Sequence, residues 1–282
     1  LSGIDGFYVD MKCSFQVFGM SALMVLVSGC RLLQPETPDE RNFAVNEVHA
    51  SRNYNARIRQ IVLHYTVIDF ERSLAVLKGE TGRSVSAHYL INDRPNKQYP
   101  DYIYRLMPED KRAWHAGVSQ WGRDANINNS SIGIEIVNPD GNLHPYPDEQ
   151  MEAVIFLLRQ LIERHQIDPV NVVGHSDVAP GRKIDPGSLF PWKTLYDNGI
   201  GAWYDVADVE AVRKTITAVP SVEQVKADLG AYGYSVDATP DADETYRAVV
   251  EAFQRHFAPG RIDGEMDLEN YRILKALLKK YR

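Results

Sequence analysis

The chain has 282 residues, of which 44% are hydrophobic, so it can bury a full core and has room for a main domain with a smaller second unit. Its formal net charge of −7 offers no basic stripe for phosphate contacts, which argues against a nucleic-acid partner. Both cysteines, Cys13 and Cys30, lie near the N-terminus, which excludes a disulfide framework and a thiolate metal site in the rest of the chain.

Residues 1–30 resemble a bacterial lipoprotein signal. After the expected start at Met11, a short basic segment is followed by an apolar run over residues 15–27 that is too short to span a membrane comfortably. Small residues then precede Cys30, which we expect to be lipidated. A buried core helix is the alternative, but the run shows no amphipathic pattern.

Residues 31–56 are polar, contain two prolines and have no sustained period, so they predict a tether. Arg31, rather than aspartate, follows Cys30, which favours the outer over the inner membrane of a Gram-negative cell. We therefore expect a lipid-anchored protein of the cell envelope, on the periplasmic face of the outer membrane.

Strands and helices alternate through residues 57–205, which predicts an α/β domain. The continuous apolar run Ile61-Val62-Leu63 indicates a strand buried on both faces. The expected strands cover residues 58–66, 86–92, 103–107, 130–138 and the neighbourhood of 172–173. The expected helices cover residues 70–78, where Gly79 ends the helix, and 148–165.

Isoleucines alternate along the strand at residues 130–138. Because side chains alternate between the two faces of a strand, Glu135 is expected on the face opposite Ile132, Ile134 and Ile136. A solvated strand residue is the alternative interpretation of this carboxylate.

Helical periodicity returns after a predicted connection at residues 206–220. Ser221 followed by Gln224 is a capping-box pattern that opens a helix, and two further helices are expected before the C-terminus. Residues 221–282 therefore predict a small three-helix domain, separate from the preceding one and near the lower size limit for independent stability.

Three residues of the main domain form a candidate metal site. His64 ends the first apolar strand, and His175 precedes Asp185 by ten positions. Two imidazoles and one carboxylate are the ligand set of a catalytic zinc centre, because three protein ligands leave the fourth position open for water. The alternative is that His175 is an ordinary loop histidine and Asp185 a turn former before a proline.

Five motifs in this order resemble the zinc-dependent N-acetylmuramoyl-L-alanine amidases of the phage-lysozyme and peptidoglycan-recognition type. The resemblance covers about residues 57–204. The motifs are Leu63-His64-Tyr65-Thr66, Ser86-Ala87-His88-Tyr89-Leu90-Ile91, Trp114-His115-Ala116-Gly117, Ser131-Ile132-Gly133-Ile134-Glu135 and Gly174-His175-Ser176-Asp177.

The resemblance implies a mixed central sheet flanked by helices, and it assigns His64, His175 and Asp185 as ligands of Zn²⁺. It further implies that Glu135 is the general base and that Lys183 stabilises the oxyanion. Trp114 and His115 are expected in the wall of the substrate cleft, with mere packing as the alternative for His115. Some relatives carry a tyrosine where this chain has Ala87. A tyrosine-assisted mechanism is therefore not expected here, and proton transfer is assigned to Glu135. His88 is expected to be structural.

The implied reaction is hydrolysis of the amide between N-acetylmuramic acid and L-alanine in peptidoglycan or muropeptides during cell-wall turnover. The C-terminal helices resemble small peptidoglycan-binding domains, and the chain is expected to be monomeric. The alternative function is a non-catalytic, peptidoglycan-binding envelope lipoprotein.

Overall fold

The structure is a computed structural model that describes residues 56–236 and 242–282. The predicted lipoprotein signal, Cys30 and all but the last residue of the predicted tether lie outside these residues. Among the helices of the described ranges, none combines the length and the apolar character needed to cross a membrane.

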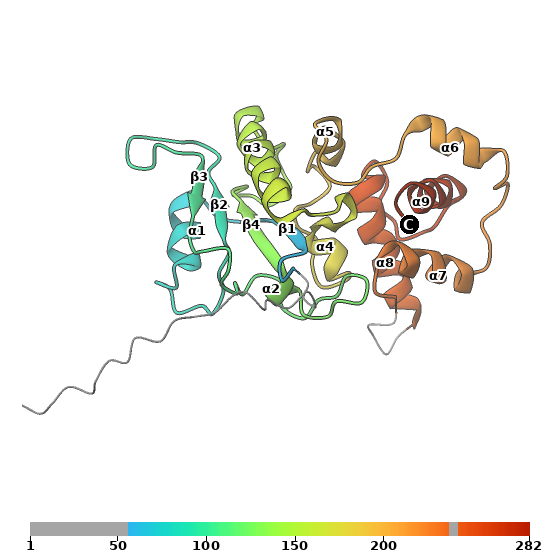
Figure 1. The fold of residues 1–282 in the computed structure, drawn as a ribbon, viewed down its shortest axis with the longest axis horizontal. Helices are drawn as coiled ribbons and strands as arrows, with labels where there is room; N and C mark the ends of the chain where they lie inside the picture. The colour runs from blue at the N-terminus through green and yellow to red at the C-terminus, as the bar shows by residue number, and fades with distance from the viewer. Residues whose placement is uncertain (1–55, 237–241) are drawn as a thin grey trace, which may run out of the picture. The chain divides into compact units, whose positions relative to one another are not determined.

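A five-stranded mixed sheet forms the centre, with the strand order β3-β2-β4-β1-β5 (Figure 1). The strands are β1 (Gln60–Tyr65), β2 (Tyr89–Ile91), β3 (Ile103–Arg105), β4 (Ser131–Ile136) and β5 (Val172–Gly174). Only the pairing of β2 with the edge strand β3 is antiparallel; β1 pairs in parallel with β4 and β5, and β4 with β2. The predicted mixed sheet is thus confirmed.

The register of the central strands brings polar side chains to one edge of the sheet. His64 on β1 lies opposite Glu135 on β4, and Leu63 lies opposite Gly174 at the end of β5. Because parallel strands end at the same edge, residues at or just after these ends gather there. The same register puts His64 and Glu135 on one face, and the β4 isoleucines on the other.

Helices cover both faces of the sheet. The long helix α3 (Asp148–His165) buries the stripe that its periodicity predicted, and its buried side chains join one core cluster with the β1 and β4 residues. On the other face, α1 (Phe70–Leu77) packs in a second cluster with Leu90 of β2. Shorter helical segments complete the domain: α2 (Ile127–Ser130), η1 (Pro169–Asn171), α4 (His175–Val178) and α5 (Trp192–Asp197).

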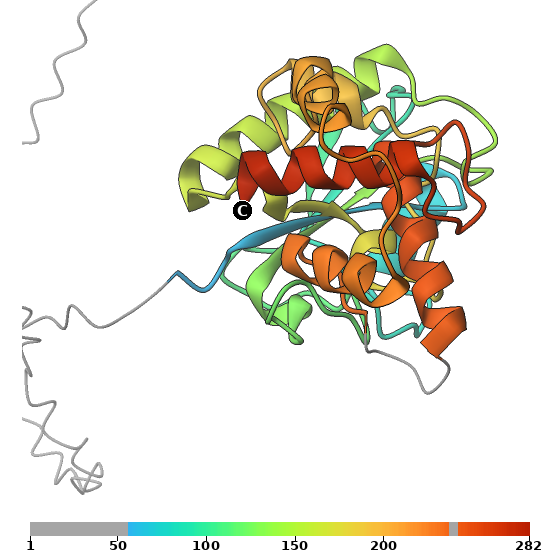
Figure 2. The same cartoon turned by 90° about the vertical axis from the view of Figure 1, so that its right-hand side faces the viewer.

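Four helices form the C-terminal part: α6 (Val206–Arg213), α7 (Val222–Tyr232), α8 (Ala242–Phe257) and α9 (Leu268–Tyr281). The predicted connection therefore contains a helix, whose buried residues Val209 and Val212 are too few to give a clear period. In Figure 2, α9 lies between α6 and α7, in agreement with the contacts among these helices. Of the predicted capping box only half is formed, because the Ser221 side chain caps α7 while the Gln224 side chain bonds Asp228 instead.

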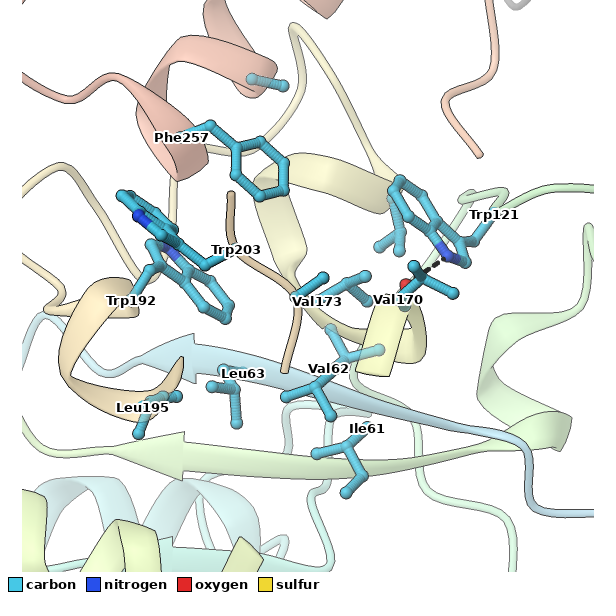
Figure 3. Packing of buried hydrophobic residues seen from close by; sticks show 14 of the residues in the cluster. Ile61, Val62, Leu63, Trp121, Val170, Val173, Trp192, Leu195, Trp203 and Phe257 are labelled. Atoms are coloured by element: carbon cyan, nitrogen blue, oxygen red, sulfur yellow. Dashed lines mark hydrogen bonds between the residues drawn. The ribbon is translucent and has the colours of Figure 1, made fainter. Parts of the chain in front are cut away.

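The C-terminal helices share a hydrophobic core with the sheet. Phe257 of α8 packs on Trp203, with ring centroids 5.7 Å apart, close to Val173 of β5 (Figure 3). Trp121, whose indole donates to the Val170 carbonyl, packs edge-on against Tyr234. The described residues accordingly form one compact unit, and the domain boundary near 206–220 stays a prediction.

Candidate metal centre and active site

His64, His175 and Asp185 meet at the carboxyl edge of the sheet. His64 lies on β1, His175 begins α4 directly after β5, and Asp185 follows in the next loop. All three are buried, and the two Nδ1 atoms and the Asp185 Oδ2 atom lie 3.0 Å from one another in each pair. These residues form the one group of metal-ligating type found within the described ranges.

The hydrogen bonds around this group show that it fits a cation. The Nε2 atom of His175 lies 3.1 Å from the Ala116 carbonyl oxygen, which can only accept, and 3.5 Å from Arg182 Nη2; the shorter contact assigns the proton to this nitrogen. The Nδ1 atom of His175 therefore presents a lone pair to Asp185. His175 Nδ1 and the Asp185 carboxylate thus offer electron pairs at one point, with His64 Nδ1 3.0 Å from each of them, as metal ligands do.

The loop that carries Asp185 is closed on α4 by backbone bonds. The Ser176 amide donates to the Asp185 carbonyl over 2.9 Å, and the Lys183 amide donates to the Ala179 carbonyl over 3.1 Å. The sequence separation of ten therefore becomes direct contact. His175 is a buried first helical residue rather than an ordinary loop histidine.

A buried carboxylate links α4 to the C-terminal helices. Asp177, fully buried, accepts from the Gly174 amide at 2.7 Å, from the Tyr234 hydroxyl at 2.8 Å and from His256 Nδ1 at 2.7 Å. The His256 ring also stacks on the Trp192 ring, with 3.7 Å between the ring centroids. The bond to the Gly174 amide fixes the start of α4. Tyr234 and His256, which bond the same carboxylate, therefore help to hold the backbone next to His175.

Glu135 and Lys183 line the same cavity as the three ligands, a space of about 580 Å³. Burial and the nearby Asp185 raise the pKa of Glu135 to about 8, although Lys183 opposes this. Within residues 56–236 and 242–282, neither side chain has a salt-bridge partner, so both groups are available to a ligand in the cavity. A carboxyl group with a pKa near neutrality is suited to accept and return a proton.

Trp114 and His115 also line this cavity. Trp114 is half exposed, and the Arg112 guanidinium lies 4.3 Å from its ring centroid. The His115 ring is engaged at both nitrogens, with His64 Nε2 at 2.9 Å and the Ser131 hydroxyl at 3.1 Å. A substrate contact at Trp114 stays a prediction, and His115 has no free ring nitrogen to offer one.

His88 is held entirely by the backbone. Its Nδ1 accepts from the Gly133 amide at 3.0 Å, so its Nε2 carries the proton and donates to the Lys111 carbonyl at 3.0 Å. It therefore presents no lone pair to the metal group. The neighbouring Ala87 is fully buried.

Sequence reasoning overlooked three residues near the site. Arg182 donates to the carbonyls of Ala116 and Val118 and lines the cavity, while Asp177 and His256 form the buried link described above. An acidic residue three positions after Gly174 is a recognisable helix-start signal that could have pointed to Asp177. No local pattern marks His256, because its partner lies 79 positions away.

Comparison with known proteins agrees with this geometry. The model of the family N-acetylmuramoyl-L-alanine amidase matches residues 54–188. The N-acetylmuramoyl-L-alanine amidase AmiD of Escherichia coli (strain K12) is 38% identical, over 94% of this chain and 98% of its own length. The chain belongs to the N-acetylmuramoyl-L-alanine amidase family.

Two solved structures share the fold of this amidase closely. AmpDH3 from Pseudomonas aeruginosa has a TM-score of 0.76 at 40% identity, covering 87% of this chain and 98% of its own. AmiD from E. coli, solved with the substrate anhydro-N-acetylmuramic acid-L-Ala-D-gamma-Glu-L-Lys, has a TM-score of 0.76 at 37% identity, covering 86% and 97%. The predicted amidase activity is thereby confirmed, which argues against the alternative of a non-catalytic binding protein.

Proposed function

We propose that this amidase uses zinc to cleave the amide between N-acetylmuramic acid and L-alanine in muropeptides. The convergence of His64, His175 and Asp185 carries the proposal, because these atoms present three lone pairs around one point. Two imidazoles and one carboxylate are a common ligand set of catalytic zinc. Two relatives solved with anhydromuramic peptides support the substrate class.

The site divides the chemistry among its side chains. Zinc, when bound, supplies Lewis acidity, which polarises a carbonyl and acidifies water. Glu135 takes the proton of the attacking water and returns it to the leaving amine, which departs as a free peptide. The Lys183 ammonium stabilises the negative charge that develops on the carbonyl oxygen. Trp114 offers a half-exposed apolar face at the cavity wall.

The test uses the purified protein and the muropeptide anhydro-N-acetylmuramic acid-L-Ala-D-gamma-Glu-L-Lys. Mass spectrometry is expected to show the free sugar and the free peptide, chelation to abolish the products, and zinc to restore them. His64→Ala and His175→Ala should lose both metal and activity. Full activity after exhaustive chelation would contradict the zinc proposal.

We further propose that Cys30 is lipidated and anchors the protein to the periplasmic face of the outer membrane. The support is the apolar run that ends at small residues before Cys30, with Arg31 after it. Metabolic fatty-acid labelling and membrane fractionation test this in Cys30→Ala, with Cys13→Ala as a matched control. Label retained in Cys30→Ala would contradict it. A monomeric state, checked by light scattering, completes the proposal.

A further inference from the structure

We propose that His115 is a positioning residue that, with Ser131 and Gly133, holds the His64 imidazole in the tautomer that binds metal. The inference rests on the proposed zinc site and adds a role for a side chain that sequence reasoning placed in the substrate wall. His115 reaches His64 from the loop before α2, and its ring lies edge-on to the His64 ring at 5.1 Å between centroids.

The direction of each hydrogen bond between His64, His115 and Ser131 follows from the final acceptor, the Ile127 carbonyl oxygen. The Ser131 hydroxyl lies 2.5 Å from the Ile127 carbonyl oxygen, which has no proton, so Ser131 donates its single proton there. Ser131 can then only accept from His115, whose Nε2 lies 3.1 Å away. A neutral His115 with a protonated Nε2 has a bare Nδ1.

The same logic continues to the metal ligand. His115 Nδ1 accepts, so His64 Nε2, at 2.9 Å, carries the proton and donates. The remaining nitrogen of His64, Nδ1, then holds a free electron pair, and it is this atom that lies 3.0 Å from Asp185 Oδ2. His175 reaches the same state through its shorter Nε2 contact, to the Ala116 carbonyl, so the hydrogen bonds that orient both ligating imidazoles end on backbone carbonyls.

Gly133 makes room for the His115 ring. A Cβ at this position would lie 2.5 Å from Cγ of His115 and 2.7 Å from its Nδ1, closer than atoms can approach. The backbone cannot easily yield, because the Gly133 amide and carbonyl bond His88 and β4 lies inside the sheet. Alternate positions of β4 therefore serve one purpose each: Ser131 anchors the ring, Gly133 admits it, and Glu135 faces the cavity.

The experiment measures zinc affinity by competition with a chromophoric chelator, together with thermal unfolding. His115→Leu removes the acceptor and is expected to weaken zinc binding by about 10- to 100-fold, the usual effect of losing a partner of a ligating histidine. His115→Asn keeps an acceptor where Nδ1 was, because Oδ1 occupies the corresponding position, and should restore most of the affinity. Gly133→Ala should resemble His115→Leu, because the methyl group displaces the ring.

Ser131→Ala provides a second route with a matched control. It should weaken zinc binding, whereas Ser130→Ala should not, since Ser130 is also buried but its hydroxyl bonds the carbonyls of Asn126 and Ile127 rather than a histidine of the metal site. This pair keeps the test decisive if His115→Leu fails to fold. Zinc affinity of Ser131→Ala within about threefold of wild type would overturn the proposal.

Nitrogen-15 NMR of histidine-labelled, metal-free protein gives a readout independent of metal. Wild type should show His64 with Nε2 protonated and Nδ1 bare, and His115→Leu should lose this preference. A wild-type His64 protonated at Nδ1 would refute the inference. If wild type binds no zinc at all, the proposed function fails; if wild type and His115→Leu bind zinc equally, only the positioning role fails.

Discussion

The buried link between Asp177 and the C-terminal helices makes a quantitative prediction for His256→Phe. Phenylalanine preserves the ring that stacks on Trp192 but removes the donor to Asp177 Oδ2. Because Asp177 is fully buried, water cannot replace that donor. Removing one hydrogen bond to a charged group costs about 1.5–3 kcal/mol, and breaking a buried ion pair about 3–5 kcal/mol.

These two figures bracket the expected loss of stability. At about 2–4 °C per kcal/mol for a domain of this size, the melting temperature should fall by about 3–20 °C. Tyr234→Phe removes a different donor to the same carboxylate and should cost about 1.5–3 kcal/mol. Exposed His144, replaced by phenylalanine, is the control and should change stability by less than about 0.5 kcal/mol.

A double-mutant cycle isolates the interaction. In an Asp177→Ala background the carboxylate is gone, so His256→Phe should then cost little, and the coupling energy from urea unfolding should exceed about 1.5 kcal/mol. Zinc affinity should fall alongside stability, because Asp177 also holds the Gly174 amide at the start of the His175 helix. Additive effects of the two substitutions, within about 0.5 kcal/mol, would refute the reasoning.

Three further predictions concern the site and its support. Glu135→Gln should keep its zinc but lose about 10²-fold or more in kcat; a kcat within a few-fold of wild type would assign proton transfer to another group. In metal-free protein, the Glu135 pKa of about 8 lies above the ordinary 4.5, so the folded state binds more protons between these values, and this contribution to stability falls as pH rises through that range. Burial and the nearby His175 lower the His64 pKa from 6.5 to about 4. This shift makes stability rise with pH below 6.5, but it does so equally in wild type and in Glu135→Gln. The stability of Glu135→Gln relative to wild type, from urea unfolding, should therefore increase from about pH 4.5 to about pH 8, and a constant difference would contradict the raised pKa. Deletion of residues 221–282 should destabilise the remaining domain and weaken its metal binding, because it removes two hydrogen-bond donors from Asp177 and exposes Trp121. Calorimetry and metal analysis of the fragment test this. A stable, zinc-binding fragment would show that the helices are dispensable.

The sequence by itself determined the features that depend on near neighbours. The period of the apolar residues located the central strands and α3, and alternation along β4 was enough to put Glu135 opposite the isoleucines. The histidines and the carboxylate of the metal group were recognisable as candidates from the short motifs that hold them, through their resemblance to those of the amidase family. These properties are encoded within a few positions of each residue.

Only the tertiary structure decided which distant side chains meet. The register that sets His64 beside Glu135 depends on how β1 and β4 pair, and the closing of the loop on α4 brings Asp185 within 3.0 Å of both ligating nitrogens. Hydrogen-bond direction also needs the complete surroundings of each ring, as the path from His64 through His115 shows. The same holds for the C-terminal helices, since their periodicity reveals an apolar face but not that this face covers the core beside α4.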